Sequence, residues 1–124
     1  MPETLVADEI FDRLQEVMAA DPNGFCELYR DYLSDAEESF AALRLACEQK
    51  QSQELRAKAH YLKGSSLVLG LRTVAQNCED LEALGREAHF DDATLKLAEI
   101  AKLLDSVRAE LERKLGPGVR PSAA

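Results

Sequence analysis

Hydrophobic residues recur along this chain at alternating steps of three and four, the spacing that places side chains on one face of an α-helix. The longest series runs from residue 25 to residue 47 and predicts a helix of roughly seven turns. Glu, Asp and Arg fill many of the intervening positions and predict a solvated opposite face. The apolar series consists of Phe25, Leu28, Tyr29, Tyr32, Leu33, Ala36, Phe40, Leu43 and Cys47.

Shorter series predict further helices over about 8–19, 53–69 and 71–88, and another after the Asp91–Asp92 pair. The polar stretch QKQSQ separates the second helix from the third, and Gly70 interrupts the pattern after the third. The residues expected to face inward are Ile10, Phe11, Leu14, Val17 and Met18; Leu55, Ala59, Leu62, Ser66 and Leu69; Leu71, Val74, Ala75, Cys78, Leu81 and Gly85; and Leu97, Ile100, Leu104, Val107 and Leu111.

Four long amphipathic helices joined by short connections predict an all-α fold, an antiparallel four-helix bundle. The additional short N-terminal helix is expected to cover one end, and Asp21 with Pro22 can cap and open the helix that follows it. No segment shows sustained period-two alternation, so no strand is expected. We assign residues 1–115 to the bundle domain and residues 116–124, GPGVRPSAA, to a flexible tail.

Composition narrows the class of partner. The chain has 124 residues, 46% of them hydrophobic and 31% charged, which is typical of one packed domain. A net charge of −8 disfavours nucleic acid and anionic membranes, so we expect protein partners. We also expect a monomeric chain. The N-terminus lacks a signal-peptide pattern and no apolar run is long enough to cross a bilayer, which predicts a cytoplasmic protein.

The three cysteines are too widely spaced for a metal site and are expected to be buried free thiols. They are Cys26, Cys47 and Cys78.

One of the two histidines is predicted to face solvent. At about 100° per residue, the inward series of the third helix lies within roughly 40° of Leu55. A second set of residues lies instead at about 80° to 180° from Leu55. These outward residues are Arg56, His60, Lys63, Gly64 and Leu67.

The charge pattern points to the same helix. Residues 55–78 contain no Asp or Glu, although the whole chain has 23, and they carry Arg56, Lys58, Lys63 and Arg72. A locally basic helix around an exposed imidazole suits a dianionic group such as a phosphoryl. A neutral imidazole is nucleophilic at physiological pH and needs no buried base to attack phosphorus.

Gly64 requires a reason, because glycine inside a helix costs about 1 kcal/mol relative to alanine. Either two helices pack closely there, or the space beside the imidazole is left for another protein. Because Gly64 is predicted to point outward, we favour space for a partner.

The stretch AHYLKGSS followed by LGL, residues 59–71, closely resembles the signature of histidine-containing phosphotransfer (HPt) proteins of multistep two-component phosphorelays. CEDLEALGRE, from Cys78, resembles the fungal and plant branch. The resemblance implies that His60 accepts a phosphoryl group from a receiver-domain aspartyl phosphate and passes it to another receiver's aspartate. It also implies that Lys63 supports the phosphohistidine and that Gly64 leaves room for docking.

The resemblance further implies receiver domains as partners, one of which could belong to a hybrid histidine kinase. The chain would carry no cofactor of its own, and magnesium would come with the receiver. Docking is expected on the apolar surface around Tyr61 and Leu67. The rim contacts expected around it are Arg56, Lys63, Arg72 and Arg86.

Two features depart from the fungal pattern. Fungal relatives often have an amide on the neighbouring helix facing the histidine, where this chain has Glu82, and a long insertion before the last helix is missing here. If Glu82 reaches His60, it can orient the ring by accepting a hydrogen bond from Nδ1. Alternatively, it is a solvated helix residue.

Other readings of these residues stay open. The chain could be a non-catalytic helical adaptor that binds receivers or other helical proteins, or a bundle that self-associates. His89 is expected at a helix connection with no chemical role, and no metal site is expected. No Gly-rich phosphate loop is present, so ATP-dependent activity is not expected.

Overall fold

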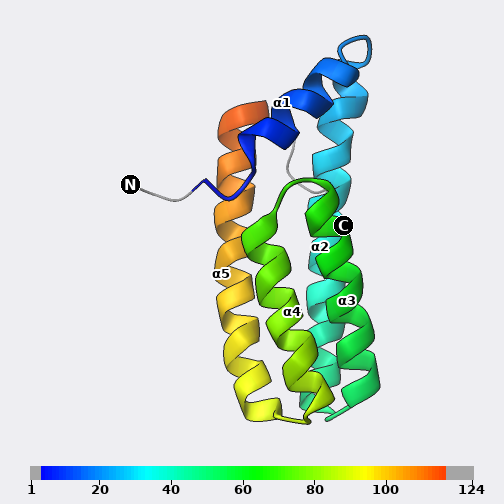
Figure 1. Cartoon of the computed structure of the whole chain (residues 1–124), viewed down its shortest axis with the longest axis vertical. Coiled ribbons are helices and arrows are strands. Elements are labelled where there is room, and N and C mark those ends of the chain that lie inside the picture. The colour runs from blue at the N-terminus through cyan, green and yellow to red at the C-terminus, as the bar shows by residue number, and fades with distance from the viewer. Residues whose placement is uncertain (1–3, 117–124) are drawn as a thin grey trace.

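The computed structural model describes residues 4–116, which form five α-helices and no strand. Four long helices run antiparallel, and α1 lies across one end of the bundle (Figure 1). The helices are α1 (Asp8–Val17), α2 (Pro22–Glu48), α3 (Ser52–Val68), α4 (Arg72–Arg86) and α5 (Phe90–Leu115). The expected all-α bundle is therefore confirmed. The predicted tail lies outside the described residues after Gly116, and the domain boundary at 115 stays a prediction.

Helix starts follow the sequence signals in one case and not in another. Asp21 caps α2 by accepting a hydrogen bond from the Gly24 N–H at 3.0 Å, and Pro22 occupies the first turn, as predicted. The expected cap of α5 at Asp91–Asp92 is wrong, because the helix already begins at Phe90 with His89 as its N-cap. The two aspartates fall in the first turn, where their charges complement the positive end of the helix dipole.

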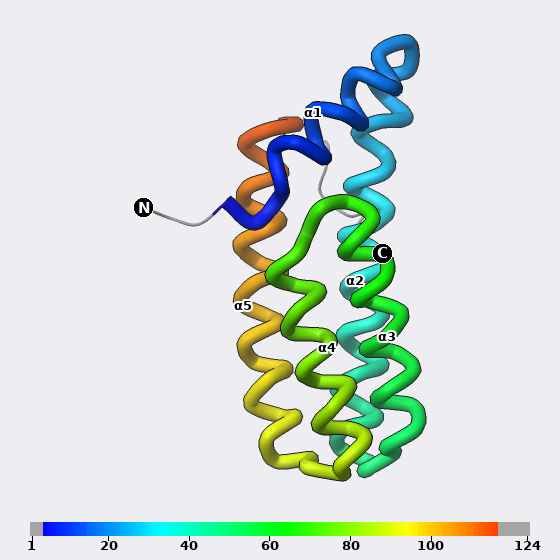
Figure 2. The backbone as a smooth tube through the Cα atoms, in the orientation of Figure 1, coloured from blue at the N-terminus to red at the C-terminus, as the bar shows by residue number. Residues whose placement is uncertain are grey.

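Three connections use a left-handed residue to end a helix. These are Lys50 after α2, Gly70 after α3 and Ala88 after α4, with φ of 54°, 81° and 58°. At each, the N–H of the left-handed residue and the N–H of the next residue donate to carbonyls near the end of the helix, which satisfies otherwise unpaired acceptors. The path in Figure 2 shows the α2–α3 and α4–α5 connections at one end of the bundle and the α3–α4 connection near α1.

The core matches the predicted inward series closely. All the inward residues predicted for the third, fourth and fifth helices are buried. The prediction is wrong at Val17, which ends α1 and is 76% exposed, and at Leu28, which lies at the edge of the α2 stripe. Of the three free thiols, Cys47 and Cys78 are buried but Cys26 is only partly buried.

Buried Glu110, which the sequence pattern did not reveal, fastens the N-terminal segment to α5. Its two carboxylate oxygens accept hydrogen bonds from the backbone N–H groups of Leu5 and Val6 at 2.9 and 2.8 Å. Farther along, Lys114 Nζ pairs with Asp8 at 2.9 Å. These contacts place α1 over the end of the bundle.

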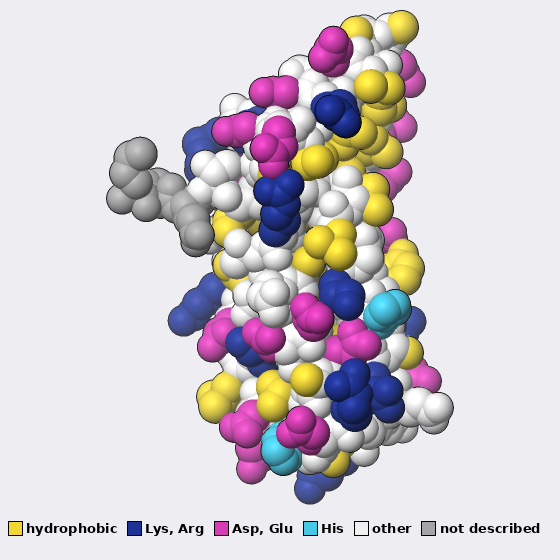
Figure 3. Space-filling view, viewed as in Figure 1, with side chains coloured by type: hydrophobic (Ala, Val, Ile, Leu, Met, Phe, Trp, Pro, Cys, Tyr) yellow, Lys and Arg dark blue, Asp and Glu magenta, His cyan; other side chains and the backbone are white. Residues whose placement is uncertain are grey.

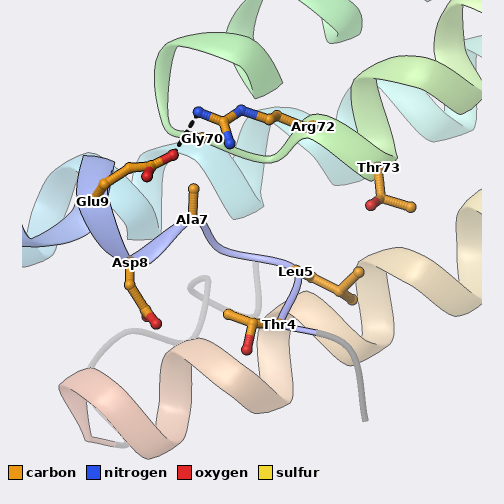
Figure 4. A pocket seen from close by; sticks show the side chains of 8 residues that line it. All are labelled: Thr4, Leu5, Ala7, Asp8, Glu9, Gly70, Arg72 and Thr73. Carbon is orange, nitrogen blue, oxygen red and sulfur yellow. Dashed lines mark hydrogen bonds and ion pairs between the residues drawn. The ribbon is translucent and has the colours of Figure 1, made fainter. Parts of the chain in front are cut away.

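The turn between α3 and α4 supports α1 from the other side. The Ala7 N–H donates to the Gly70 carbonyl at 3.1 Å, and Arg72 pairs with Glu9 at 2.7 Å (Figure 4). A Cβ on Gly70 would approach the Ile10 side chain to 2.9 Å, and its φ is positive. Both the close approach and the backbone conformation therefore require glycine here.

We predict that Glu110→Gln lowers the free energy of unfolding by about 2 kcal/mol. The substitution removes a charged acceptor from two buried N–H groups and turns an amide donor towards one of them. Urea unfolding followed by circular dichroism measures the change. Glu79→Gln, at an exposed position of α4, is the charge-matched control and should change stability by less than about 0.5 kcal/mol. Equal losses in the two variants would contradict the assigned role of Glu110.

Candidate functional site

His60 projects from the outer face of α3, midway along the bundle. It follows buried Ala59, and its own side chain is 68% exposed, as the helical spacing predicts. On the face that α3 and α4 present, Figure 3 shows Lys and Arg side chains gathered next to a histidine. The helix thus holds the imidazole at a fixed place on its backbone while leaving the ring open to solvent.

Glu82 of α4 reaches the imidazole. Its Oε1 lies 3.4 Å from His60 Nδ1 and 3.9 Å from Lys63 Nζ, so one carboxylate oxygen contacts both groups. The Glu82 side chain is only 18% exposed and that of Lys63 24%, whereas the ring is much more open. When Nδ1 carries the ring proton it donates to Glu82, and Nε2 keeps the lone pair that can attack an electrophile.

Two glycines near the site have different structural reasons. A Cβ built on Gly64 would meet nothing within 4 Å, so helix packing does not explain that glycine and the space beside His60 is open. A Cβ on Gly85 would meet Arg56 Cγ at 3.2 Å and Leu55 Cδ2 at 3.3 Å. Gly85 is therefore the residue that lets α4 approach α3, and the Ser52 hydroxyl donates to its carbonyl at the same point.

Cys78 lies buried on α4, one turn before Glu82. Burial raises the pKa of its thiol to about 12, the Glu82 carboxylate adds to that effect and Lys63 opposes it. The thiol therefore stays protonated at neutral pH and is a poor nucleophile. Cys78 is thus a buried neutral group on the same helix as Glu82.

Apolar side chains remain exposed on α3 beyond His60. Tyr61 is 53% exposed and donates its hydroxyl to Asp35 of α2 at 3.3 Å, and Leu67 is 51% exposed. Val68, which the sequence reasoning did not single out, is 71% exposed. Its position one residue before the inward-facing Leu69 could have predicted this exposure, because consecutive residues of a helix point in different directions.

The predicted basic residues divide into two groups. Arg56 and Arg86 are exposed on the α3–α4 side near Gly85, and Lys63 lies within the cluster. Arg72 lies apart from them, beneath α1, with its guanidinium paired to Glu9 (Figure 4). Its proposed role as a rim contact stays a prediction.

The second histidine is placed elsewhere. His89 occupies the N-cap position of α5 without a side-chain capping hydrogen bond, and its Nδ1 lies 3.4 Å from Glu87 Oε2. Within residues 4–116 there is no group of three or more His, Cys, Asp or Glu side chains arranged to hold a metal ion. Nor is any helix in that part of the chain long and apolar enough to cross a membrane.

Similarity to solved structures supports the fold. The chain superposes on histidine-containing phosphotransfer protein B of Pseudomonas aeruginosa with a TM-score of 0.84, at 25% identity over 92% of this chain and 96% of that one. It also matches a putative histidine-containing phosphotransfer protein from rice with a TM-score of 0.81, at 24% identity over 93% of this chain and 84% of that one.

Two proteins similar to this chain in sequence are fungal. Multistep phosphorelay regulator 1 of Schizosaccharomyces pombe is 32% identical over 86% of this chain and 36% of its own length. Phosphorelay intermediate protein YPD1 of Candida albicans is 31% identical over 64% of this chain and 44% of its own length. The matched region is thus less than half of either relative. The family model described as the Hpt domain matches residues 27–110, which cover α3 and α4 and most of α2 and α5, and the chain belongs to that family.

Proposed function

We propose that this chain is a phosphohistidine shuttle of a phosphorelay. His60 takes a phosphoryl group from the aspartyl phosphate of one receiver domain and passes it to the aspartate of another. The observation that carries the proposal is an exposed imidazole whose Nδ1 faces a carboxylate, so that Nε2 is the nitrogen left to react. Membership of the Hpt domain family and the names of the fungal relatives support it.

The chemical step needs few groups from this chain. The Nε2 lone pair attacks phosphorus, the bond from phosphorus to the aspartyl oxygen breaks, and the aspartate leaves as a carboxylate. Passing the group on reverses these events with a second aspartate. Positioning and charge stabilisation carry most of such a transfer. Glu82 orients the ring, and Lys63, about 5 Å from an added negative charge, would stabilise it by roughly 1 to 3 kcal/mol.

The receiver contributes the rest of the machinery. Both the donor and the acceptor of the phosphoryl group are receiver aspartates, and magnesium prefers carboxylate and phosphate oxygens. We therefore place the metal ion in the receiver. The shuttle is a co-substrate of the receivers, one of which could belong to a hybrid kinase, and we place it with them in the cytoplasm as a monomer.

We place receiver docking on the exposed surface of α3 around His60. Tyr61 and Leu67 supply apolar area, and Arg56 and Arg86 supply charge at the edge. The open space over Gly64 lets a partner backbone approach the imidazole. Residues 55–78, which contain no Asp or Glu, avoid repulsion with an incoming phosphoryl group, although the chain as a whole carries −8.

We predict that a phosphorylated receiver transfers its phosphate to this chain and that His60→Gln abolishes the transfer. The product should be acid-labile and alkali-stable, because it is a phosphoramidate and not an acyl phosphate. Radiolabelled phosphate followed by gel electrophoresis measures it. His89→Gln is the matched control and should accept phosphate normally. A chain that binds receivers without acquiring label would be an adaptor.

We predict that Gly64→Ala stabilises the fold by about 0.5 to 1 kcal/mol and slows phosphotransfer by about tenfold to a hundredfold. The added methyl has open space in the free protein but obstructs a docked partner. Gly85→Ala should instead destabilise the fold, because its Cβ meets Leu55 and Arg56. Thermal unfolding and single-turnover transfer measure the two effects. A destabilised Gly64→Ala protein would contradict the open space.

We predict that Leu67→Ala and Arg86→Ala each weaken receiver binding by about 1 to 2 kcal/mol. Isothermal titration with an unphosphorylated receiver measures the affinity. Leu95→Ala on α5 and Arg44→Ala on α2 are the matched controls, since both residues are exposed and lie outside α3 and α4. Unchanged affinity in the first pair, or equal losses in both pairs, would contradict docking on α3.

A further inference from the structure

Glu82 places a full negative charge against the reactive ring, and one of its oxygens is shared between the ring and an ammonium group. We propose that this charge makes the phosphohistidine on His60 short-lived and a strong phosphoryl donor. The inference rests on the proposed function, since it concerns the phosphorylated state of the same histidine. Its basis is the pair of distances from Glu82 Oε1, 3.4 Å to Nδ1 of His60 and 3.9 Å to Nζ of Lys63.

The ring proton decides how easily the phosphoryl group leaves. When a neutral imidazole attacks through Nε2, its Nδ1 proton stays in place and the product is a phosphorylated imidazolium. Cleavage of the bond between Nε2 and phosphorus returns the electron pair to Nε2, and the ring leaves as neutral imidazole. If Nδ1 has lost its proton, the ring must leave as an imidazolate, which is a much poorer leaving group. Phosphohistidine is acid-labile for this reason.

A carboxylate next to Nδ1 holds that proton in place. An opposite charge within about 4 to 6 Å favours the charged form of a titrating group. Before phosphorylation, the Lys63 ammonium offsets much of the Glu82 charge at the ring. Once the ring carries a phosphoryl dianion, the Lys63 ammonium is attracted to the phosphoryl oxygens. The Glu82 carboxylate then interacts mainly with the imidazolium.

Charge can be separated from position at this residue. Glutamine has the shape of glutamate, and its carbonyl oxygen can accept the same hydrogen bond from Nδ1, but it carries no charge. Glu82→Gln therefore keeps the orientation of the ring and removes only the electrostatic effect, whereas Glu82→Ala removes both.

Other charged groups around the ring stay constant between these variants. Arg56 precedes His60 by one turn of α3, and Arg86 follows Glu82 by one turn of α4. Cys78 is a neutral thiol under the cluster. On α2, Asp35 accepts the Tyr61 hydroxyl. A difference between Glu82 and glutamine consequently reports the charge of this one carboxylate.

The test loads the whole chain chemically with phosphoramidate, which needs no receiver, and follows loss of phosphohistidine by ³¹P NMR from pH 5.5 to 9. We expect the decay-rate profile of Glu82→Gln to lie about 0.5 to 1 pH lower than that of the parent. The rates then converge towards pH 5.5 and differ by about three- to tenfold near pH 7.5, with the variant longer-lived. Transfer to a receiver should slow in the same proportion.

Matched controls isolate the effect. Glu79→Gln removes an exposed carboxylate from the same helix and should decay like the parent. In about 6 M guanidinium, which unfolds most domains, phosphohistidine should decay at the same rate in all variants, because the contact between Glu82 and His60 is lost. Lys63→Gln should shorten the lifetime, since it removes the cation that is attracted to the phosphoryl oxygens. Glu82→Ala, which also removes the charge, should be longer-lived than the parent near pH 7.5 and supplies an independent arm if Glu82→Gln does not fold.

The outcomes separate this inference from the proposed function. Loading of His60 with equal decay of parent and Glu82→Gln at every pH overturns the inference alone. A rate difference of the same size at all pH values overturns it too, because the inference requires the two rates to converge once Nδ1 is protonated in both proteins. Failure of receivers to phosphorylate a chain that phosphoramidate loads at His60 overturns the proposed function instead. A Lys63→Gln protein with a longer lifetime also contradicts the inference.

Discussion

The close approach of α3 and α4 at Gly85 is the constraint on which the site depends. A Cβ at that position would lie 3.2 to 3.4 Å from side-chain atoms of Leu55 and Arg56, so the absence of a side chain at Gly85 favours this spacing. The two helices run antiparallel, and each turn along α3 therefore faces a turn nearer the start of α4. With Gly85 opposite residues 55 and 56, one turn further brings Glu82 opposite His60. The ion-pair geometry of the site follows from a packing contact made by residues that take no part in the chemistry.

The site combines two opposite electrostatic tendencies. Residues 55–78 are free of Asp and Glu in a chain of net charge −8, so the helix that carries His60 is the part of the surface best suited to a dianion. Glu82 then introduces one carboxylate from the neighbouring helix, largely shielded from water, at the side of the ring that faces inward. The outer side of the ring stays open beside the bare backbone of Gly64. The phosphoryl group would thus be attracted at the open outer side of the ring, whereas the carboxylate that promotes its release lies at the inner side.

Helical periodicity predicted the fold and the exposure of His60, because both depend on which face of a helix a residue occupies. Contacts between distant segments were beyond it. Glu110 looked like an ordinary solvated residue, and its burial depends on backbone groups more than a hundred residues away. The hydrogen bond between Tyr32 and Ser66, 2.8 Å across the α2–α3 interface, is hidden for the same reason. The stop signals after α2 and α4 were weak because Lys50 and Ala88, not glycine, adopt the left-handed conformation.

The reactive histidine lies between two points at which α3 is fixed. At one end, the Ser52 hydroxyl and Gly85 bind the start of α3 to the end of α4. At the other, the turn at Gly70 is closed by its own backbone hydrogen bonds and lies under α1, and Glu110 binds the segment just before α1 to α5. A helix anchored at both ends cannot slide or rotate without breaking one of these contacts, so the distance from His60 to Glu82 is maintained. In this way α1, although remote from the imidazole, contributes to the geometry on which transfer through one ring nitrogen depends.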